Sequence, residues 1–257
     1  MSLLHAIILG IVEGITEFFP VSSTGHLILA GTLIGVPQTA FVKSFEIAIQ
    51  LGAILAVVVL YGRSFVRVPV LTRLAAAFVP TGILGFLLYK IVKGYLLGNG
   101  TIVVWALGIG GIMFIAFELV YGSRPREGSV NLESVSYSAA ATMGVAQAIA
   151  MVPGVSRSAA TVVGGMMCGV SRAVALEFSF LLAVPTMLAA TGYDLFKNAG
   201  VFVGADWSAL VVGFVVSFVV ALASIKWLMA FMRRHTFIPF GVYRIFAALA
   251  FYFAVIR

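Results

Sequence analysis

Two short segments of this sequence carry acidic, hydroxyl and basic side chains within otherwise apolar surroundings. Residues 10–26 read GIVEGITEFFPVSSTGH, and residues 144–161 read GVAQAIAMVPGVSRSAAT. They align with Ser22 on Ser156, so one pattern occurs twice along the chain. In each copy, proline and glycine break an apolar helix at a hydroxyl-rich turn. Because ionisable groups are costly in apolar segments, we expect these residues to have a function.

The first copy contains two glutamates. Glu13 and Glu17 are four residues apart and therefore share one face of a helix. Two carboxylates this close repel each other in an apolar setting, unless one is protonated or a cation lies near them. The pair therefore predicts either a protonated carboxyl group or a cation close by. The alternative is that both side chains extend to the outer membrane surface.

A hydroxyl-rich turn follows the glutamates and opens a short helix. Taken alone, Ser22 and Ser23 are expected to cap that helix, since serine side chains satisfy the free N–H groups at a helix start. The same N–H groups also bind anions, and the two roles can share one site. His26 lies one helical turn further on and is a catalytic candidate, although a lone histidine is also common as a structural residue.

The second copy places an arginine at a broken-helix start. Arg157 has Ser156, Ser158 and Thr161 around it, and this set of donors suits a phosphate or a carboxylate. The alternative is an internal ion pair between Arg157 and one of the two glutamates of the first copy, which would hold the two segments together. The pair does not exclude a functional role.

The composition is that of an integral membrane protein. The chain is 62% hydrophobic and 10% charged, with a mean hydropathy of +1.14. Its net charge of +7 is better explained by basic cytoplasmic loops than by nucleic acid, and we expect no nucleic-acid partner. The lone Cys168 excludes an intramolecular disulfide and is expected to be a buried small residue. Glu118 is expected in an interface or a loop.

The sequence predicts an all-α fold in the membrane, with about six membrane-spanning helices. A span takes about 20 apolar residues, and such stretches lie near 44–61, 74–93, 102–121, 173–193, 207–230 and 239–256.

The segments around the two polar turns are too short to cross the membrane. Residues 3–19 and 27–35 flank the first turn, and residues 138–152 and 159–169 flank the second. We expect each to form a re-entrant helical hairpin. Broken helices at matching positions in two halves indicate a binding site near the membrane midplane.

The halves are expected to interlock as inverted-topology repeats. Repeat one covers about 1–121 and repeat two about 138–257, within one polytopic domain of residues 1–257. Basic residues gather in loops 62–73 and 122–137 and in segment 226–235. These places should be cytoplasmic, so both termini should face outward.

The blocks EGITEFFPVSSTGH, PGVSRSAAT and LEFSFLLAVP together resemble the undecaprenyl-pyrophosphate phosphatases of the bacitracin-resistance type. The resemblance covers nearly the whole chain. It implies hydrolysis of undecaprenyl pyrophosphate to undecaprenyl phosphate and inorganic phosphate. That reaction recycles the carrier lipid for cell-wall peptidoglycan synthesis and gives bacitracin resistance. It also implies a site in the bacterial cytoplasmic (inner) membrane that faces the periplasm or cell exterior.

The resemblance also assigns roles to residues. It implies a divalent cation, Mg²⁺ or Ca²⁺, held by Glu13 and Glu17. The implied catalytic residues are Glu17, Ser23, His26 and Arg157. The implied substrate-binding residues are Ser22, Ser156, Arg157, Ser158 and Thr161. Ser23 is the first choice of nucleophile, with His26 as its base; direct attack by His26 or by water stays open.

The partners expected are undecaprenyl pyrophosphate and membrane lipid, and we include a homodimer. The alternative function is a polyprenyl-phosphate transporter or flippase that uses the same phosphate site, because inverted repeats with broken helices are also the architecture of secondary transport. The acidic pair occurs in one copy only, with Gln147 and Met151 at the matching positions of the other. This asymmetry favours an enzyme.

Overall fold

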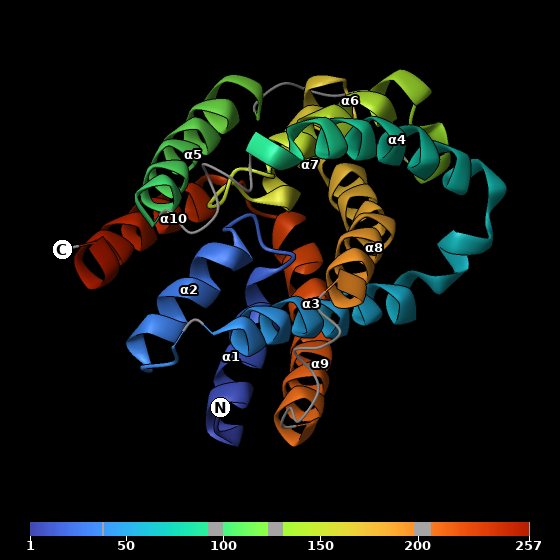
Figure 1. The fold of residues 1–257 in the computed structure, drawn as a ribbon. Helices are drawn as coiled ribbons and strands as arrows, with labels where there is room; N and C mark the ends of the chain where they lie inside the picture. The colour runs from blue at the N-terminus through green and yellow to red at the C-terminus, as the bar shows by residue number, and fades with distance from the viewer. Residues whose placement is uncertain (38, 92–99, 123–130, 198–206, 257) are drawn as a thin grey trace.

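The computed structural model describes residues 1–37, 39–91, 100–122, 131–197 and 207–256, and all regular structure in this part of the chain is helical (Figure 1). The main helices are α1 (Leu3–Thr16), α2 (Ser23–Leu33), α3 (Ala40–Tyr61), α4 (Val68–Ile91), α5 (Gly100–Tyr121), α6 (Tyr137–Ile149), α7 (Arg157–Met167), α8 (Arg172–Lys197), α9 (Trp207–Met232) and α10 (Ile238–Phe251). Short turns of 3-10 helix cover Gly62–Val66 and Leu132–Ser134, and a π-helical turn, Tyr252–Ile256, follows α10. The predicted all-α class is confirmed.

Five helical segments of the described chain are long and apolar enough to cross a membrane: Ala40–Val66, Val68–Leu88, Gly100–Tyr121, Arg172–Tyr193 and Trp207–Met232. The sixth span predicted near 239–256 corresponds to a shorter apolar helix, Ile238–Ala254. The chain is therefore a multi-pass membrane protein.

In each half of the chain, one helical hairpin precedes the long helices. α1 and α2 form the first hairpin, and α6 and α7 form the second. None of these four helices exceeds 14 residues, which is short of the roughly 20 residues that a span takes. Each half thus consists of one hairpin, two long helices and a third helix, which is long in the first half (α5) and has 14 residues in the second (α10).

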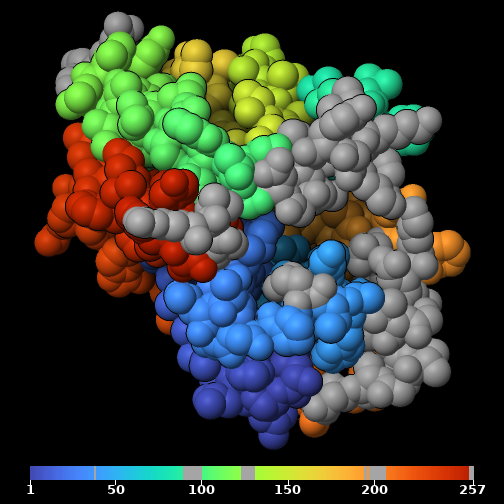
Figure 2. All heavy atoms as spheres, turned by 60° about the vertical axis from the view of Figure 1, so that its left-hand side comes forward, coloured from blue at the N-terminus to red at the C-terminus, as the bar shows by residue number. Residues whose placement is uncertain are grey.

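The two halves pack into each other. α1 lies along α9, and α6 lies along α4, so the first arm of each hairpin contacts the second long helix of the other half. α5 packs against α10, and α3 against α8 and α9. Figure 2 shows α2 and α3 (blue) next to α5 and α10 (green and red) on one face of the molecule. The repeat boundaries and the single-domain assignment stay predictions.

Glycine allows the closest of these helix contacts. A Cβ added at Gly10 would lie 2.8 Å from the carbonyl oxygen of Gly213, and one at Gly14 would lie 2.7 Å from that of Ser217. Both carbonyls belong to α9. Gly144 meets the carbonyl of Ala77 on α4 in the same way. Small residues four apart thus bring the helix backbones together.

Two minor expectations are wrong. Glu118 is 3% exposed, and its Oε1 forms an ion pair with Arg172 at the start of α8. The other carboxylate oxygen of Glu118, Oε2, accepts a hydrogen bond from Phe237 N at 3.4 Å. This carboxylate is buried because the N–H groups around it satisfy its charge. Cys168 is exposed, since it lies at the C-terminal cap of α7, beyond the packed part of the hairpin.

Candidate functional site

The turn of the first hairpin carries backbone strain at a serine. Ser22 has φ 72° and is the one non-glycine residue with positive φ in the described chain. It occupies the N-cap position of α2, yet its side chain makes no capping hydrogen bond. The capping interpretation is therefore wrong for Ser22. Strain of this kind costs on the order of 1–3 kcal/mol and persists only where the surrounding structure holds it.

The turn of the second hairpin is built differently. Gly154 supplies the positive φ, 92°, that a serine adopts in the first turn. Ser156 is the N-cap of α7, and its hydroxyl accepts a hydrogen bond from Ala159 N at 3.3 Å. The same hydroxyl lies 3.2 Å from Ser158 Oγ and 3.5 Å from the carbonyl oxygen of Phe19, so it also touches the first hairpin.

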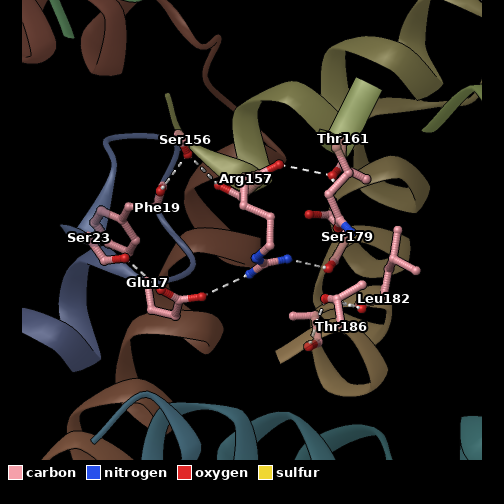
Figure 3. Close-up of polar contacts among 12 residues, drawn as sticks. Glu17, Phe19, Ser23, Ser156, Arg157, Thr161, Ser179, Leu182 and Thr186 are labelled. Carbon is pink, nitrogen blue, oxygen red and sulfur yellow. Dashed lines mark hydrogen bonds and ion pairs between the residues drawn. The ribbon is translucent and has the colours of Figure 1, made fainter. Parts of the chain in front are cut away.

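Arg157 connects the first hairpin with α8 (Figure 3). Its Nη2 donates to Glu17 Oε1 at 3.2 Å, and its Nη1 donates to the carbonyl oxygen of Ser179 at 2.9 Å. The ion pair proposed as the alternative from sequence is therefore present. The Nε of Arg157 is buried and has no partner among the described residues, so one donor of the guanidinium remains for a ligand.

Glu17 is shared between Arg157 and Ser23. Ser23 Oγ donates to Glu17 Oε2 at 2.6 Å, while Oε1 of the same carboxylate accepts from Arg157 (Figure 3). Glu17 is 6% exposed. Ser23 and Arg157 thus bond the same buried carboxylate, although they come from different halves of the sequence.

The hydrogen bond expected between Ser23 and His26 is not formed. His26 Nδ1 lies 2.7 Å from the carbonyl oxygen of Ser22, and Nε2 lies 2.7 Å from Tyr243 Oη. Since a carbonyl can only accept, Nδ1 carries the proton, and in the neutral ring Nε2 accepts from the tyrosine hydroxyl. The rings of His26 and Tyr243 stack with centroids 5.4 Å apart. The side chain that Ser23 bonds instead is the Glu17 carboxylate.

Glu13 is a buried carboxylate without hydrogen bonds. It is 0% exposed, and neither side-chain oxygen has a partner among the described residues. Glu17, Glu46 and Arg157 are close enough to act on it electrostatically. Two free carboxylate oxygens next to further acids suit a cation that takes oxygen ligands.

The described residues do not by themselves form a complete set of metal ligands. The described residues contain no group of three or more His, Cys, Asp or Glu side chains placed to hold a metal ion. Mg²⁺ is commonly held by one or two carboxylates together with water and substrate phosphates. Glu13 and Glu17 therefore fit a divalent cation that binds together with a phosphorylated ligand.

The remaining predicted residue, Thr161, lies deeper in α7. It is 0% exposed, and its hydroxyl donates to the carbonyl of Arg157 at 2.9 Å and to Gln147 Oε1 at 3.4 Å. Gln147 Nε2 in turn donates to Thr81 on α4 at 3.4 Å. Thr161 is thus placed to support the start of α7 rather than to lie at its tip. Its substrate-binding role stays a prediction.

Sequence reasoning missed one residue, Arg244 on α10. It is 2% exposed, and its guanidinium donates to four backbone carbonyls. These belong to Pro20 at 3.2 Å, Gly154 at 3.1 Å, Ala106 at 3.0 Å and Leu107 at 3.4 Å. One side chain therefore holds both hairpin turns and α5. An arginine within the predicted span 239–256 was the available signal, by the same cost that singles out Arg157.

The site as a whole brings two broken-helix turns together inside a multi-pass membrane protein. It gathers an arginine with a free donor, an unpaired carboxylate, a serine bonded to a carboxylate, and two helix starts. These groups suit a membrane protein that binds an anionic, phosphate-like group at the junction of two hairpins.

Comparison with known sequences specifies the family. The chain belongs to the family of bacitracin resistance protein BacA, whose family model matches residues 6–250. It is 52% identical to an undecaprenyl-diphosphatase of Sulfurihydrogenibium sp. over 98% of this chain and 99% of that one. It is 51% identical to one of Aquifex aeolicus over 96% of both chains, and 46% identical to one of Thermus thermophilus over 98% of this chain and 97% of that one.

We predict that Arg244→Lys destabilises the protein strongly. The three N–H donors of lysine lack the planar fork that reaches four carbonyls, and each buried carbonyl left unpaired costs about 1–3 kcal/mol. In a chain of this size each kcal/mol lowers Tm by about 2–4 °C. Thermal unfolding in detergent should show a Tm drop of more than about 4 °C. Arg233→Lys, at an exposed position, is the matched control. Equal Tm values for the two variants would show that Arg244 does not hold the turns.

Proposed function

We propose that this protein removes the terminal phosphate of undecaprenyl pyrophosphate, giving undecaprenyl phosphate and inorganic phosphate. Family membership over nearly the full length and the names of the relatives support this activity. The structural observation that carries it is the Glu17 carboxylate, bonded at once to Ser23 and to Arg157. The enzyme is a hydrolase of a phosphoanhydride. Its product is the lipid carrier for cell-wall synthesis, and the activity gives bacitracin resistance.

Binding of the pyrophosphate head depends first on Arg157. Its free Nε and the helix start at Ser156 offer N–H donors to phosphate oxygens. An incoming anion also competes with Glu17 for the guanidinium, which loosens the ion pair and leaves the carboxylate freer to act on Ser23. Phosphoryl transfer needs mainly positioning and charge neutralisation, and both are supplied at this junction.

Ser23 is the proposed nucleophile, and Glu17 is the proposed base. Ser23 Oγ attacks the terminal phosphorus while its proton passes to Glu17 Oε2, 2.6 Å away. The bond between that phosphorus and the bridging oxygen breaks, and its electron pair leaves with undecaprenyl phosphate. Water then hydrolyses the phosphoserine and releases inorganic phosphate. His26 or water as direct nucleophile are the alternatives.

Glu13 and Glu17 are the proposed holders of a divalent cation, Mg²⁺ or Ca²⁺. Such a cation would neutralise charge on the pyrophosphate and on the leaving group. Without it, two buried carboxylates would face the anionic substrate, so activity should require the metal.

The transporter alternative is less well supported. The relatives are named as diphosphatases, and the acidic pair and the histidine occur in the first hairpin only. A phosphate clamp for transport needs no nucleophile bonded to a base.

The first prediction concerns the activity itself. Purified protein should release phosphate from undecaprenyl pyrophosphate, and excess EDTA should abolish the release until Mg²⁺ or Ca²⁺ is returned. Arg157→Ala should lose at least about a hundredfold in kcat/KM, since a charge-stabilising donor of this kind is worth roughly 10²–10³-fold. Arg63→Ala, at an exposed position, should keep wild-type activity. No release by folded, metal-supplied wild type would overturn the proposed function.

The second prediction concerns the nucleophile. Ser23→Ala should lower kcat at least about a hundredfold, because it removes the attacking oxygen. Rapid quenching with substrate labelled in the terminal phosphate should give a labelled peptide that contains Ser23. Ser138→Ala, on an exposed face of α6, is the control. Substantial hydrolysis by Ser23→Ala, with label on His26 or on no residue, would transfer the role to His26 or to water.

We further propose that the site faces the outside of the cytoplasmic membrane. The basic segments at Arg63, Arg67 and Arg73 and at Arg233–Arg234 support a cytoplasmic position for that end of the molecule. Arg124 and Arg126, which belong to the same prediction, lie outside the described residues. The second hairpin then enters from the cytoplasm, and Cys168 lies on the cytoplasmic side.

The single cysteine is a native probe of this orientation. A membrane-impermeant thiol reagent should label the exposed Cys168 only after the cells are permeabilised. Leu33→Cys in a Cys168→Ala background should be labelled in intact cells, because Leu33 is 68% exposed at the end of the first hairpin. The reverse labelling pattern would show that the orientation is inverted.

A further inference from the structure

An apolar groove runs between α5 and the second hairpin. Its volume is about 860 Å³, and Figure 2 shows a recess between the green surface of α5 and the yellow-green surface of that hairpin. α5 contributes side chains from Thr101 to Tyr121, a stretch that is about 30 Å long at 1.5 Å per residue. Almost all of the lining is hydrocarbon, including Trp105, Met113 and Phe117.

α7 separates this groove from the polar site. One face of α7 lines the groove, through Ala159, Ala160, Val163, Gly164 and Met167. An adjacent side of the helix carries Arg157, which reaches Glu17 and Ser179, and Thr161, which reaches Gln147. The two environments meet at the tip of the helix, where Ser156 both lines the groove and caps α7.

In the first hairpin, side chains fill the space that corresponds to this groove. In the alignment that places Ser22 on Ser156, His26 of α2 falls on Ala160 of α7. His26 is stacked on Tyr243 of α10, whereas Ala160 faces an open groove beside α5. Small side chains on α7 therefore keep a channel open in one half that aromatic rings fill in the other.

We propose that this groove binds the isoprenoid chain of the lipid pyrophosphate substrate, an inference that rests on the proposed phosphatase function. When the pyrophosphate head group is held at the start of α7, the isoprenoid chain attached to it starts near Ser156, where the groove begins. An apolar lining matches hydrocarbon. Among the described residues that line the groove, one guanidinium, that of Arg244, is present, and it is turned to backbone carbonyls. Because the groove is continuous with the polar site, the isoprenoid chain of the substrate fits it better than a bulk membrane lipid or a second copy of the protein does.

The test compares two substrates in variants that fill the groove. Val163 lies seven residues from Ser156, about 10 Å along α7. Val163→Phe should lower kcat/KM for undecaprenyl pyrophosphate about tenfold, mainly through KM, because a blocked apolar pocket loses uniform binding. Geranyl pyrophosphate, whose two isoprene units end before this position, should change less than about twofold. Val219→Phe, on an exposed face of α9 outside the groove, should affect neither substrate.

The outcomes separate the groove from the function. Equal loss on both substrates would mean that the variant disturbs the site, and no loss on either would mean that the groove holds other lipid; each result overturns the proposal. Failure of wild type to hydrolyse either substrate would instead overturn the phosphatase function. A readout without turnover covers that case: a photoreactive undecaprenyl phosphate should crosslink to peptides of α5 and α7. Crosslinks only elsewhere would overturn the groove assignment.

Discussion

The site depends on the interaction between Arg244 and the backbone of both hairpin turns. Breaking a helix inside a membrane protein leaves carbonyl groups without donors, and each must be satisfied by the protein. The carbonyls of Pro20 and Gly154 are such groups, and one guanidinium satisfies both. The same side chain bonds the carbonyls of α5. The distance between the two turns, and with it the contact between Glu17 and Arg157, follows from this shared anchor.

The repeat places different chemistry at equivalent positions. Ser23 is the first residue of α2, and Arg157 is the first residue of α7; the two align with each other. Both bond the same carboxylate, Glu17, one through each oxygen. In the proposed mechanism, a duplicated helix start therefore supplies the nucleophile in one half and the anion-binding cation in the other.

The second half shows how the position equivalent to Glu13 is stabilised when an uncharged residue occupies it. Gln147 aligns with Glu13, and its amide is satisfied by Thr81 and Thr161. Glu13 has no such partners. An amide network in one half and a buried carboxylate without a hydrogen-bond partner in the other support the cation proposed at Glu13, since a buried unpaired carboxylate is costly.

Sequence reasoning predicted the helical class of the fold and several of the residues that the two hairpin turns bring together. The helical class, the hairpins around Pro20 and Pro153, and the pairing of Arg157 with an acidic residue follow from hydropathy, from proline and from the cost of buried charge. The partner of Ser23 could not be predicted, because helix spacing favours His26, whereas the strained turn at Ser22 directs the serine to Glu17. Arg244 was missed because its partners are backbone carbonyls, which have no signature in sequence.

The way the halves are joined also bears on the choice between an enzyme and a transporter. Alternating access requires one repeat to move against the other around a fixed site. Here α1 lies on α9, α6 lies on α4, and Arg244 ties both turns to α5. Movement of one turn away from the other would break several buried hydrogen bonds at once, at about 1–3 kcal/mol for each group left unpaired. Phosphoryl transfer benefits from this rigidity, because positioned groups accelerate the reaction without reorganising. The constraint that makes movement costly is therefore the one that favours hydrolysis at a fixed junction.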